Sequence, residues 1–349
     1  MDWKKLIVIS ALLTATSALQ AGNSCNYDNN CCYQPSCCDF GGFTISGEYL
    51  YWNARVPQLD YAVNYDANNS EFPSNSVKRI CPEYDSGFRI GLEKECDCWV
   101  YGASYTWYRN SQFRDYIDTA DANIAGTRII DDLTVVSQGE DIVYASADWK
   151  LDYDYVNLYV AYDSCYSDCV DARLFGGFTF AFVDQRLISQ YSDSSDLDGT
   201  GTDWDKVTEK INMDSYGLSF GIAPTYHWNQ CFELFGVFSY DTLLTRTDRY
   251  FLYQTTVTGG STITDAADLR AEDCWNLVGV LNLSVGVTYI WNNCWCDQDV
   301  AISLGYEFHN WFNTLGYLDL QDESGEITFD RYLNGLGFDG LFVKVAASF

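Results

Sequence analysis

Apolar and polar residues alternate with a period of two along ten stretches of the chain. This period places successive side chains on opposite faces and predicts β-strands, and no stretch shows the 3.6-residue period of an amphipathic helix. The predicted strands cover residues 42–52, 84–94, 99–108, 151–162, 170–186, 214–227, 232–244, 276–291, 300–311 and 340–349. We therefore expect an all-β, antiparallel protein.

The clearest predicted strand runs from Val300 to His309. Its apolar face comprises Val300, Ile302, Leu304, Tyr306 and Phe308, and its small or polar face comprises Ala301, Ser303, Gly305, Glu307 and His309. A membrane barrel points the apolar face outward, whereas a water-soluble sandwich points it inward. The alternation alone does not distinguish these two folds.

The lengths of the connections favour the membrane barrel. Long gaps of about 31, 42, 27, 31 and 28 residues alternate with gaps of a few residues. Outer-membrane β-barrels alternate long extracellular loops with short periplasmic turns in this way, and such long structureless connections are uncommon inside one globular domain. We predict a transmembrane barrel over residues 40–349 with about ten strands. Twelve to fourteen strands are the alternative, because residues 128–147 and 255–264 could each form an extra hairpin.

The final strand carries the alternation to the last residue. Its apolar face ends on an aromatic residue and consists of Leu341, Val343, Val345, Ala347 and Phe349. We interpret this face as the assembly signal of an outer-membrane barrel, which implies the barrel-assembly machinery and outer-membrane lipid as partners.

The N-terminus predicts export from the cytoplasm. Lys4 and Lys5 precede a mostly apolar stretch that ends near the small residue Ala21, which is the pattern of a cleaved signal peptide. We assign residues 1–21 to the signal peptide and residues 22–39 to a Cys-rich periplasmic segment. The turns of the barrel are then expected to be periplasmic as well.

The composition excludes some functions. The chain has 49 Asp and Glu against 20 Lys and Arg, with a net charge of −29, and nucleic-acid binding requires a basic patch. An aromatic content of 17% argues against a disordered acidic chain. The only two histidines, His227 and His309, suggest no Ser/His/Asp arrangement, so we expect neither an enzyme nor a cofactor.

Fourteen cysteines in an exported chain predict disulfides. Five precede the first strand, namely Cys25, Cys31, Cys32, Cys37 and Cys38. Seven fall in predicted short turns, namely Cys96, Cys98, Cys165, Cys169, Cys231, Cys294 and Cys296. We expect some of these twelve to link copies of the chain to one another or to other Cys-rich envelope proteins, with internal disulfides as the alternative. Cys81 and Cys274 lie on the loop side and could pair with each other.

Three motifs do not predict ligand sites. The Cys-x-Cys, Cys-x3-Cys and adjacent Cys-Cys spacings do not suit zinc, so no metal site is expected. Gly335, Gly337 and Gly340 match a phosphate-binding pattern but lead into a strand, not into a helix. The acidic segment 194–205 resembles a calcium loop without its full set of ligands.

Period-two phasing also predicts the lining of the barrel. The inward residues are Glu48, Arg89, Glu93, Tyr153, Asn157, Arg173, Glu233, Asp241, Asn282, Glu307, His309 and Lys344. Acids outnumber bases among them, so a conducting pore would prefer cations. The same residues could instead form ion pairs that plug the lumen. A ten-stranded barrel should also be narrow.

Several segments resemble the Legionella-type major outer-membrane protein family, which also occurs in Chlamydia-like bacteria. They are Gly47 to Ala62, Gly87 to Leu92, Tyr105 to Trp107, Leu174 to Phe178, Asp184-Gln185, Ser215 to Leu218, Leu304 to Asn313 and Gly337 to Phe342, in the family's order. The resemblance implies a pore-forming outer-membrane barrel without catalytic residues. It also implies adhesin or antigen roles for exposed loops that contact a host surface.

Two functions follow as hypotheses. The first is a porin-like channel for small hydrophilic solutes and ions, linked by disulfides into the envelope. The second is a structural or adhesive outer-membrane protein whose plugged barrel anchors its exposed loops.

Overall fold

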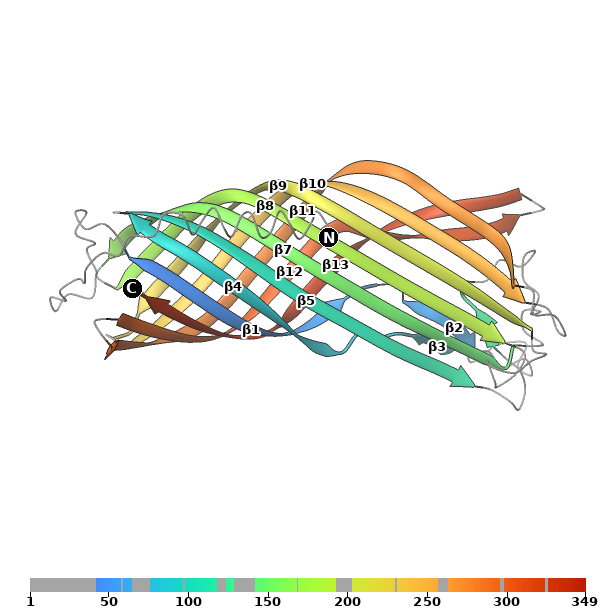
Figure 1. Cartoon of the computed structure of the whole chain (residues 1–349), viewed down its shortest axis with the longest axis horizontal. Helices are drawn as coiled ribbons and strands as arrows, with labels where there is room; N and C mark the ends of the chain where they lie inside the picture. Colours follow the sequence, from blue (N-terminus) through green and yellow to red (C-terminus); the bar gives the residue numbers. More distant parts are fainter. Residues whose placement is uncertain are drawn as a thin grey trace.

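A computed structural model shows a single closed antiparallel barrel (Figure 1). The structure describes residues 42–57, 59–64, 76–96, 98–117, 124–128, 142–167, 169–192, 203–229, 231–256, 263–295, 298–323 and 326–349. The predicted signal peptide and the Cys-rich segment lie outside these residues. Within them, no helix has both the length and the apolarity to cross a bilayer.

Ten strands form the wall of the barrel. They are β1 (Phe43–Arg55), β4 (Tyr84–Cys96), β5 (Trp99–Ile117), β7 (Tyr144–Ser167), β8 (Val170–Ser192), β9 (Trp204–His227), β10 (Phe232–Thr256), β11 (Ile263–Trp295), β12 (Gln298–Glu323) and β13 (Glu326–Ser348). Each strand pairs with its neighbour along the wall, and β1 closes the barrel by pairing with both β4 and β13. The prediction of ten strands is confirmed, and the alternative of twelve to fourteen is wrong.

The short turns and the C-terminus lie at one end of the barrel, which we term the turn end. There the Phe43 amide donates to the Phe349 carbonyl at 3.1 Å. The opposite end, the loop end, carries the connections between β1 and β4 and between β5 and β7. Figure 1 shows the C-terminus at the left and β2 and β3 at the right.

The long connections are shorter than the sequence suggested, because the strands continue far past their predicted limits. The register of β10 with β11 runs from Phe232 and Tyr289 to Thr256 and Ile263. The described residues of the second segment, 255, 256, 263 and 264, therefore belong to these two strands. Likewise, residues 144–147 belong to β7. These segments add height to the barrel and no extra strands.

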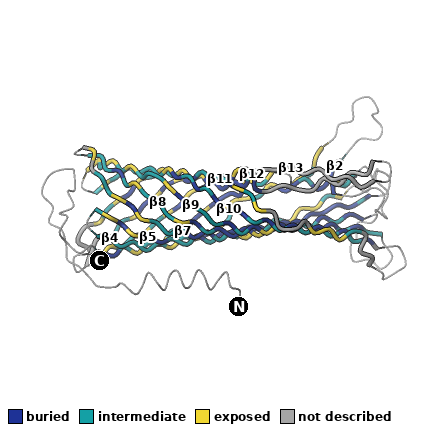
Figure 2. The backbone as a smooth tube through the Cα atoms, turned by 90° about the horizontal axis from the view of Figure 1, so that it is seen from above, coloured by how far each residue is buried: buried dark blue, intermediate teal, exposed yellow. Residues whose placement is uncertain are grey.

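The turn-end part of the wall carries an apolar outer surface. Figure 2 shows exposed positions alternating with less exposed ones along the strands in this part. On β12, Leu304 is 52% exposed whereas Glu307 is 4% exposed, so the faces predicted from the alternation are correct. On the last strand, Leu341, Val343 and Val345 point outward as predicted. An outward apolar band flanked by aromatic residues is typical of a membrane barrel.

Toward the loop end, the outer face of the wall becomes polar and the inner face becomes apolar. On β7, Val160 and Tyr162 are exposed near the turn end, but farther along the exposed residues are Lys150 and Asp152. The inward residues change from polar near the turn end to apolar near the loop end, where Trp149 is fully buried in an apolar core. The loop-end part of the barrel thus has the polarity of a water-soluble protein.

A small sheet that the sequence did not reveal lies within this loop-end part. It consists of β2 (Asp60–Asn64), β3 (Ser76–Arg79) and β6 (Ile124–Gly126), in the order β3-β2-β6. Its residues Tyr61 and Ile124 belong to the same buried core as Trp149. The Tyr191 hydroxyl on β8 donates to the Tyr61 carbonyl at 2.6 Å, which ties the sheet to the inner wall.

We expect Val285→Arg to destabilise the inserted barrel by about 2–4 kcal/mol, because a cation in the middle of an apolar belt is costly. Val285 is 63% exposed on the outer face of β11. The free energy of unfolding, measured by denaturant titration in phospholipid vesicles, would show this loss. Asn212→Arg, on the outer face above the belt, should cost at most about 1 kcal/mol. Equal effects at the two sites would contradict this position for the belt.

Candidate functional site: a polar cavity inside the barrel

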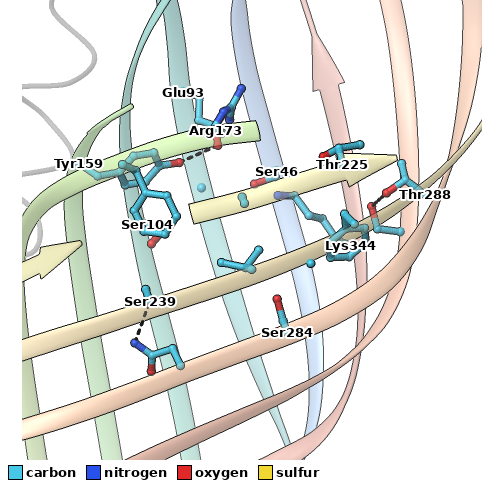
Figure 3. Close-up of a pocket in the computed structure, with 18 of the residues that line it drawn as sticks. Ser46, Glu93, Ser104, Tyr159, Arg173, Thr225, Ser239, Ser284, Thr288 and Lys344 are labelled. Atoms are coloured by element: carbon cyan, nitrogen blue, oxygen red, sulfur yellow. Dashed lines mark hydrogen bonds and ion pairs between the residues drawn. The ribbon is translucent and has the colours of Figure 1, made fainter. Parts of the chain in front are cut away.

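A polar cavity of about 640 Å³ occupies the turn-end part of the barrel interior. It reaches from Gly42 and Glu95 near the turn end to Tyr155 and His309 in the middle of the barrel. Figure 3 shows side chains from many strands, among them Glu93, Arg173 and Lys344, pointing into it. The strands supply these side chains because every second residue of a barrel wall points inward.

Ten of the twelve inward residues predicted from the sequence line this cavity. They are Glu48, Arg89, Glu93, Asn157, Arg173, Glu233, Asn282, Glu307, His309 and Lys344. The other two, Tyr153 and Asp241, are also inside the barrel, but both are fully buried in packed layers and do not line the cavity. Period-two phasing gave the direction of these side chains and not the depth at which the interior closes.

Arg89 on β4 is the central cation of the cavity. Its Nη1 donates to Glu48 Oε2 at 2.6 Å, and its Nη2 donates to Glu307 Oε2 at 3.1 Å. The Glu307 side chain is 4% exposed, and in the wall its strand is separated from β4 by β1 and β13. The pair therefore joins different sides of the interior.

The hydrogen bonds continue from Glu307 across the barrel. His309 Nε2 lies 3.2 Å from Glu307 Oε2, and His309 Nδ1 donates to Asn282 Oδ1 at 2.6 Å. Asn282 Nδ2 donates to Asp241 Oδ2 at 2.9 Å, and the Tyr155 hydroxyl donates to the same oxygen at 2.6 Å. We term this chain of side chains, Glu48-Arg89-Glu307-His309-Asn282-Asp241-Tyr155, the polar crossbar. It links β1 and β4 to β10 and β7 through the lumen.

Aromatic rings form a second layer next to the polar crossbar. The rings of Trp52 and Phe338 lie 5.5 Å apart, those of Tyr153 and Phe338 lie 4.5 Å apart, and those of Tyr153 and Trp311 lie 6.1 Å apart. Tyr108 also contacts Trp52 and Phe338. We term these five residues the aromatic layer. All five are at most 1% exposed, and Trp52 Nε1 donates to Glu307 Oε1 at 2.9 Å.

Sequence reasoning missed Trp52, Tyr108, Trp311 and Phe338. A signal was present, because the reversed polarity of the alternation puts bulky apolar residues inward at these positions. The same reversal explains why the apolar core continues from the aromatic layer to the small sheet. There Arg128 donates to Glu209 on β9 at 3.1 Å, with both side chains largely buried.

Ion pairs also hold the turn-end part of the cavity. Arg173 donates to Glu93 at 2.9 Å and to Asp163 at 2.7 Å. His227 lies between two carboxylates, with Nε2 2.7 Å from Asp171 and Nδ1 2.9 Å from Glu233. The ion pairs raised as an alternative to a pore lining are therefore present.

Carboxylates outnumber fixed cations in this lining. Seven Asp and Glu residues face the cavity, against three Lys and Arg residues. A surplus of carboxylates around an aqueous space attracts cations and repels anions. The cavity therefore has a net negative potential.

The described turn cysteines lie around the turn end. The carbonyls of Cys98, Cys169 and Cys231 accept hydrogen bonds from Asp163, His227 and Ile290 on neighbouring strands. Cys96 and Cys231 carry free thiols, and so does the exposed Cys81 on the loop side. The side chain of Cys274 is not among those that the structure describes, so the Cys81–Cys274 pair stays a prediction. The N-terminal cysteines, Cys296 and most of the acidic segment 194–205 lie outside the described residues.

The closed antiparallel sheet and its outward apolar belt define an outer-membrane β-barrel protein. More specifically, residues 35–349 match the family described as Legionella pneumophila major outer membrane protein precursor, and the chain belongs to this family. The resemblance seen in the sequence is thereby confirmed. No curated protein matches the chain.

Several solved structures are similar in fold at low sequence identity. The outer membrane protease OmpT from Escherichia coli shows 10% identity and a TM-score of 0.36 over 91% of this chain and 97% of that chain. The translocator domain of autotransporter NalP from Neisseria meningitidis shows 11% identity and a TM-score of 0.33 over 87% and 88%. A Pseudomonas aeruginosa FadL homologue shows 10% identity and a TM-score of 0.26 over 88% and 90%.

We expect Arg89→Gln to destabilise the barrel by about 3–5 kcal/mol, because it leaves Glu48 and Glu307 buried without their cation. The double variant Arg89→Gln/Glu307→Gln should recover at least half of this loss. The free energy of unfolding in detergent would be measured for both. Arg114→Gln, which breaks an exposed pair with Glu83, should cost no more than about 1 kcal/mol. An Arg89 variant as stable as the Arg114 variant would argue against the crossbar.

Proposed function

We propose that this protein is an outer-membrane barrel with a closed lumen, which anchors its loop-end part at the cell surface. The observation that carries this proposal is the pair of layers that cross the interior, the polar crossbar and the aromatic layer. Both are built mainly from residues of the wall itself, such as Arg89, Glu307, Trp52 and Phe338. The displacement of a loop would therefore not remove them.

The energetics of opening support a closed lumen. A ten-stranded barrel lies close to the size at which side chains fill the interior. Exposure of one large apolar side chain costs about 1.5–3 kcal/mol, and the aromatic layer contains five rings that are nearly completely buried. Separation of Arg89 from its carboxylates would add the cost of a broken buried ion pair.

A porin-like channel for small hydrophilic solutes and ions is the second candidate. The polar cavity favours it, because open space lined largely by polar side chains already occupies the turn-end part of the lumen. The resemblance to a pore-forming family favours it as well. The surplus of carboxylates in the lining would make such a channel prefer cations.

We also propose how the protein is exported, assembled and oriented in the outer membrane. Residues 1–21 act as an export signal, the turn end faces the periplasm, and the C-terminal face ending in Phe349 is recognised by the assembly machinery. The loop end then faces the exterior, where it contacts host surfaces. We propose no enzymatic activity, because His227 contacts Asp171 and Glu233, and His309 contacts Glu307 and Asn282, as structural partners.

Disulfides link the turn end to the rest of the envelope in this proposal. Cys96 and Cys231 carry free thiols at the periplasmic end, and the N-terminal segment adds five more cysteines. An oxidising compartment converts accessible thiols into disulfides. The partners are other copies of this chain or other Cys-rich envelope proteins.

Planar-bilayer conductance tests the closed lumen directly. We expect the folded mature protein, checked by heat-modifiable gel mobility, to give no reproducible current steps with or without reductant. Cation-selective steps from the unmodified protein would overturn the closed lumen and establish the channel. The reversal potential in a salt gradient would report the selectivity.

A matched variant shows whether the assay would detect an open barrel. It combines Trp52→Ala, Tyr153→Ala and Phe338→Ala with replacement of residues 59–80 by a short Gly/Ser linker, which removes the main rings and β2 and β3. We expect this variant to conduct and to prefer cations, because the cavity carboxylates remain. A folded variant that stays silent would argue that other residues close the lumen.

Non-reducing gel electrophoresis of intact envelopes tests the disulfide links. We expect species of higher mass that collapse to the monomer on reduction, because accessible thiols at the periplasmic end pair in an oxidising compartment. Cys96→Ser/Cys231→Ser should weaken the high-mass species, whereas Cys81→Ser on the loop side should not. A monomer band without reductant would contradict the cross-linked layer.

A further inference from the structure

Four basic residues and one tyrosine form a row across five adjacent strands on the outside of the barrel. Lys150 on β7 is paired with Arg186 on β8, and Arg186 is paired with Lys210 on β9. Lys210 is paired with Tyr250 on β10, and Tyr250 is paired with Arg270 on β11. Directly paired residues of neighbouring strands point to the same face of a sheet. We term these five residues the basic row.

The basic row faces outward. Each of its strand neighbours Trp149, Leu187, Ile211 and Phe251 is buried in the interior core, and adjacent residues of a strand point to opposite faces. Lys150, Lys210 and Arg270 are exposed. The chain has only 20 basic residues against 49 acidic ones. Four cations at directly paired positions therefore make a locally basic surface on an acidic protein.

Tyr250 brings two of these cations together. Lys210 Nζ lies 5.6 Å from the centre of the Tyr250 ring, and the Arg270 guanidinium lies 5.3 Å from it. Each cation is attracted by the aromatic ring, while the two cations repel each other. An anion between them would relieve this repulsion, and the Tyr250 hydroxyl is a further hydrogen-bond donor.

Neighbouring carboxylates neutralise this row only in part. Asp148 lies 3.4 Å from Arg186, and Asp268 lies 3.5 Å from Arg270. All four side chains are more than one third exposed, so these pairs contribute little. Among the residues that the structure describes, no carboxylate lies within ion-pair distance of Lys150 or Lys210.

The height of the basic row separates it from the apolar belt. From the row toward the turn end, β7 and β8 first present Asp152 and Asp184 outward, and the apolar belt then begins at Val156 and Phe180. Three steps of two residues on a tilted strand correspond to about 15 Å above the hydrocarbon. Phosphates at the very base of a lipid head group would meet carboxylates, whereas phosphates farther out would meet the cations.

We propose that the basic row binds phosphate groups on the head group of an anionic glycolipid in the outer leaflet, with Lys210, Tyr250 and Arg270 at its centre. A lipid is the favoured occupant because the row faces sideways from the wall, above the belt. Phosphate contacts with Arg and Lys supply both charge and hydrogen bonds. The proposal rests on the outward orientation of the loop end and is independent of whether the lumen conducts.

The test uses the full-length mature protein in phosphatidylcholine discs, with lipopolysaccharide of phosphorylated core as the probe. Native mass spectrometry would measure its binding to the unmodified protein and to Lys210→Gln, Arg270→Gln and the double variant. We expect each single variant to bind about fivefold more weakly and the double variant about 25-fold, from the usual contribution of a basic residue near an anionic surface. The unmodified protein should bind dephosphorylated lipopolysaccharide no more tightly than the double variant binds the phosphorylated form.

Lys94→Gln is the matched control, because Lys94 lies on the outer face near the turn end, against Phe43. It should bind the probe as the unmodified protein does. The proposal is overturned if the double variant binds equally well or if removal of the phosphates has no effect. Inorganic phosphate bound as tightly as the glycolipid would replace the lipid with free phosphate. Binding of a soluble sulfated polysaccharide without the glycolipid would instead indicate a surface glycan.

Discussion

The pairing of β1 with β13 is the interaction on which the rest of the structure depends. A sheet in a bilayer has no water to satisfy an open edge, so every backbone group must be paired within the barrel. The register from Thr44 and Ser348 to Arg55 and Gly337 meets this requirement over the whole apolar belt. Closure after ten strands then fixes a narrow interior, and side chains must either fill it or surround a small aqueous space.

The chain does both, in two parts of one continuous sheet. Near the turn end, small and charged inward residues leave a cavity, and pairs such as Arg173 with Glu93 neutralise part of its charge. Toward the loop end, the inward residues are large and apolar, and residues of β2 and β6 together with Ile80 complete the filling. The polar crossbar lies at the boundary, where Glu307 contacts both Arg89 and Trp52. Its hydrogen bonds allow buried charge to sit beside an apolar core.

Much of the barrel could be predicted from the sequence, for a physical reason. Each wall residue has either lipid or the interior on its side, so the period of two carries fold, strand number and direction, as in the strand from Val300 to His309. The strand lengths could not be read in the same way. Above the belt water replaces lipid, the apolar residues move to the inner face, and a segment such as 144–150 no longer continues the pattern below it.

The aromatic layer could not be predicted from the sequence, because it depends on contacts between strands that are distant along the chain. Trp52 and Phe338 are separated by almost the full length of the chain, yet their rings are in contact. Likewise, β2 pairs with β6 although β4 and β5 lie between them in the sequence. The identity of Tyr153 as an inward residue was evident, but its place in a packed layer depends on its distance from Phe338.

The reversal of polarity explains why an anchoring function suits this architecture. Below it, the wall is stabilised by lipid on the outside and tolerates a polar cavity inside, as the pairing of charges around Arg89 illustrates. Above it, lipid contributes nothing, and the strands can stay paired only if they have a core of their own. Trp149, Tyr61 and Ile124 supply that core. A wide open channel would remove this core, and the projecting part of the barrel would then lose the apolar burial that keeps it folded in water.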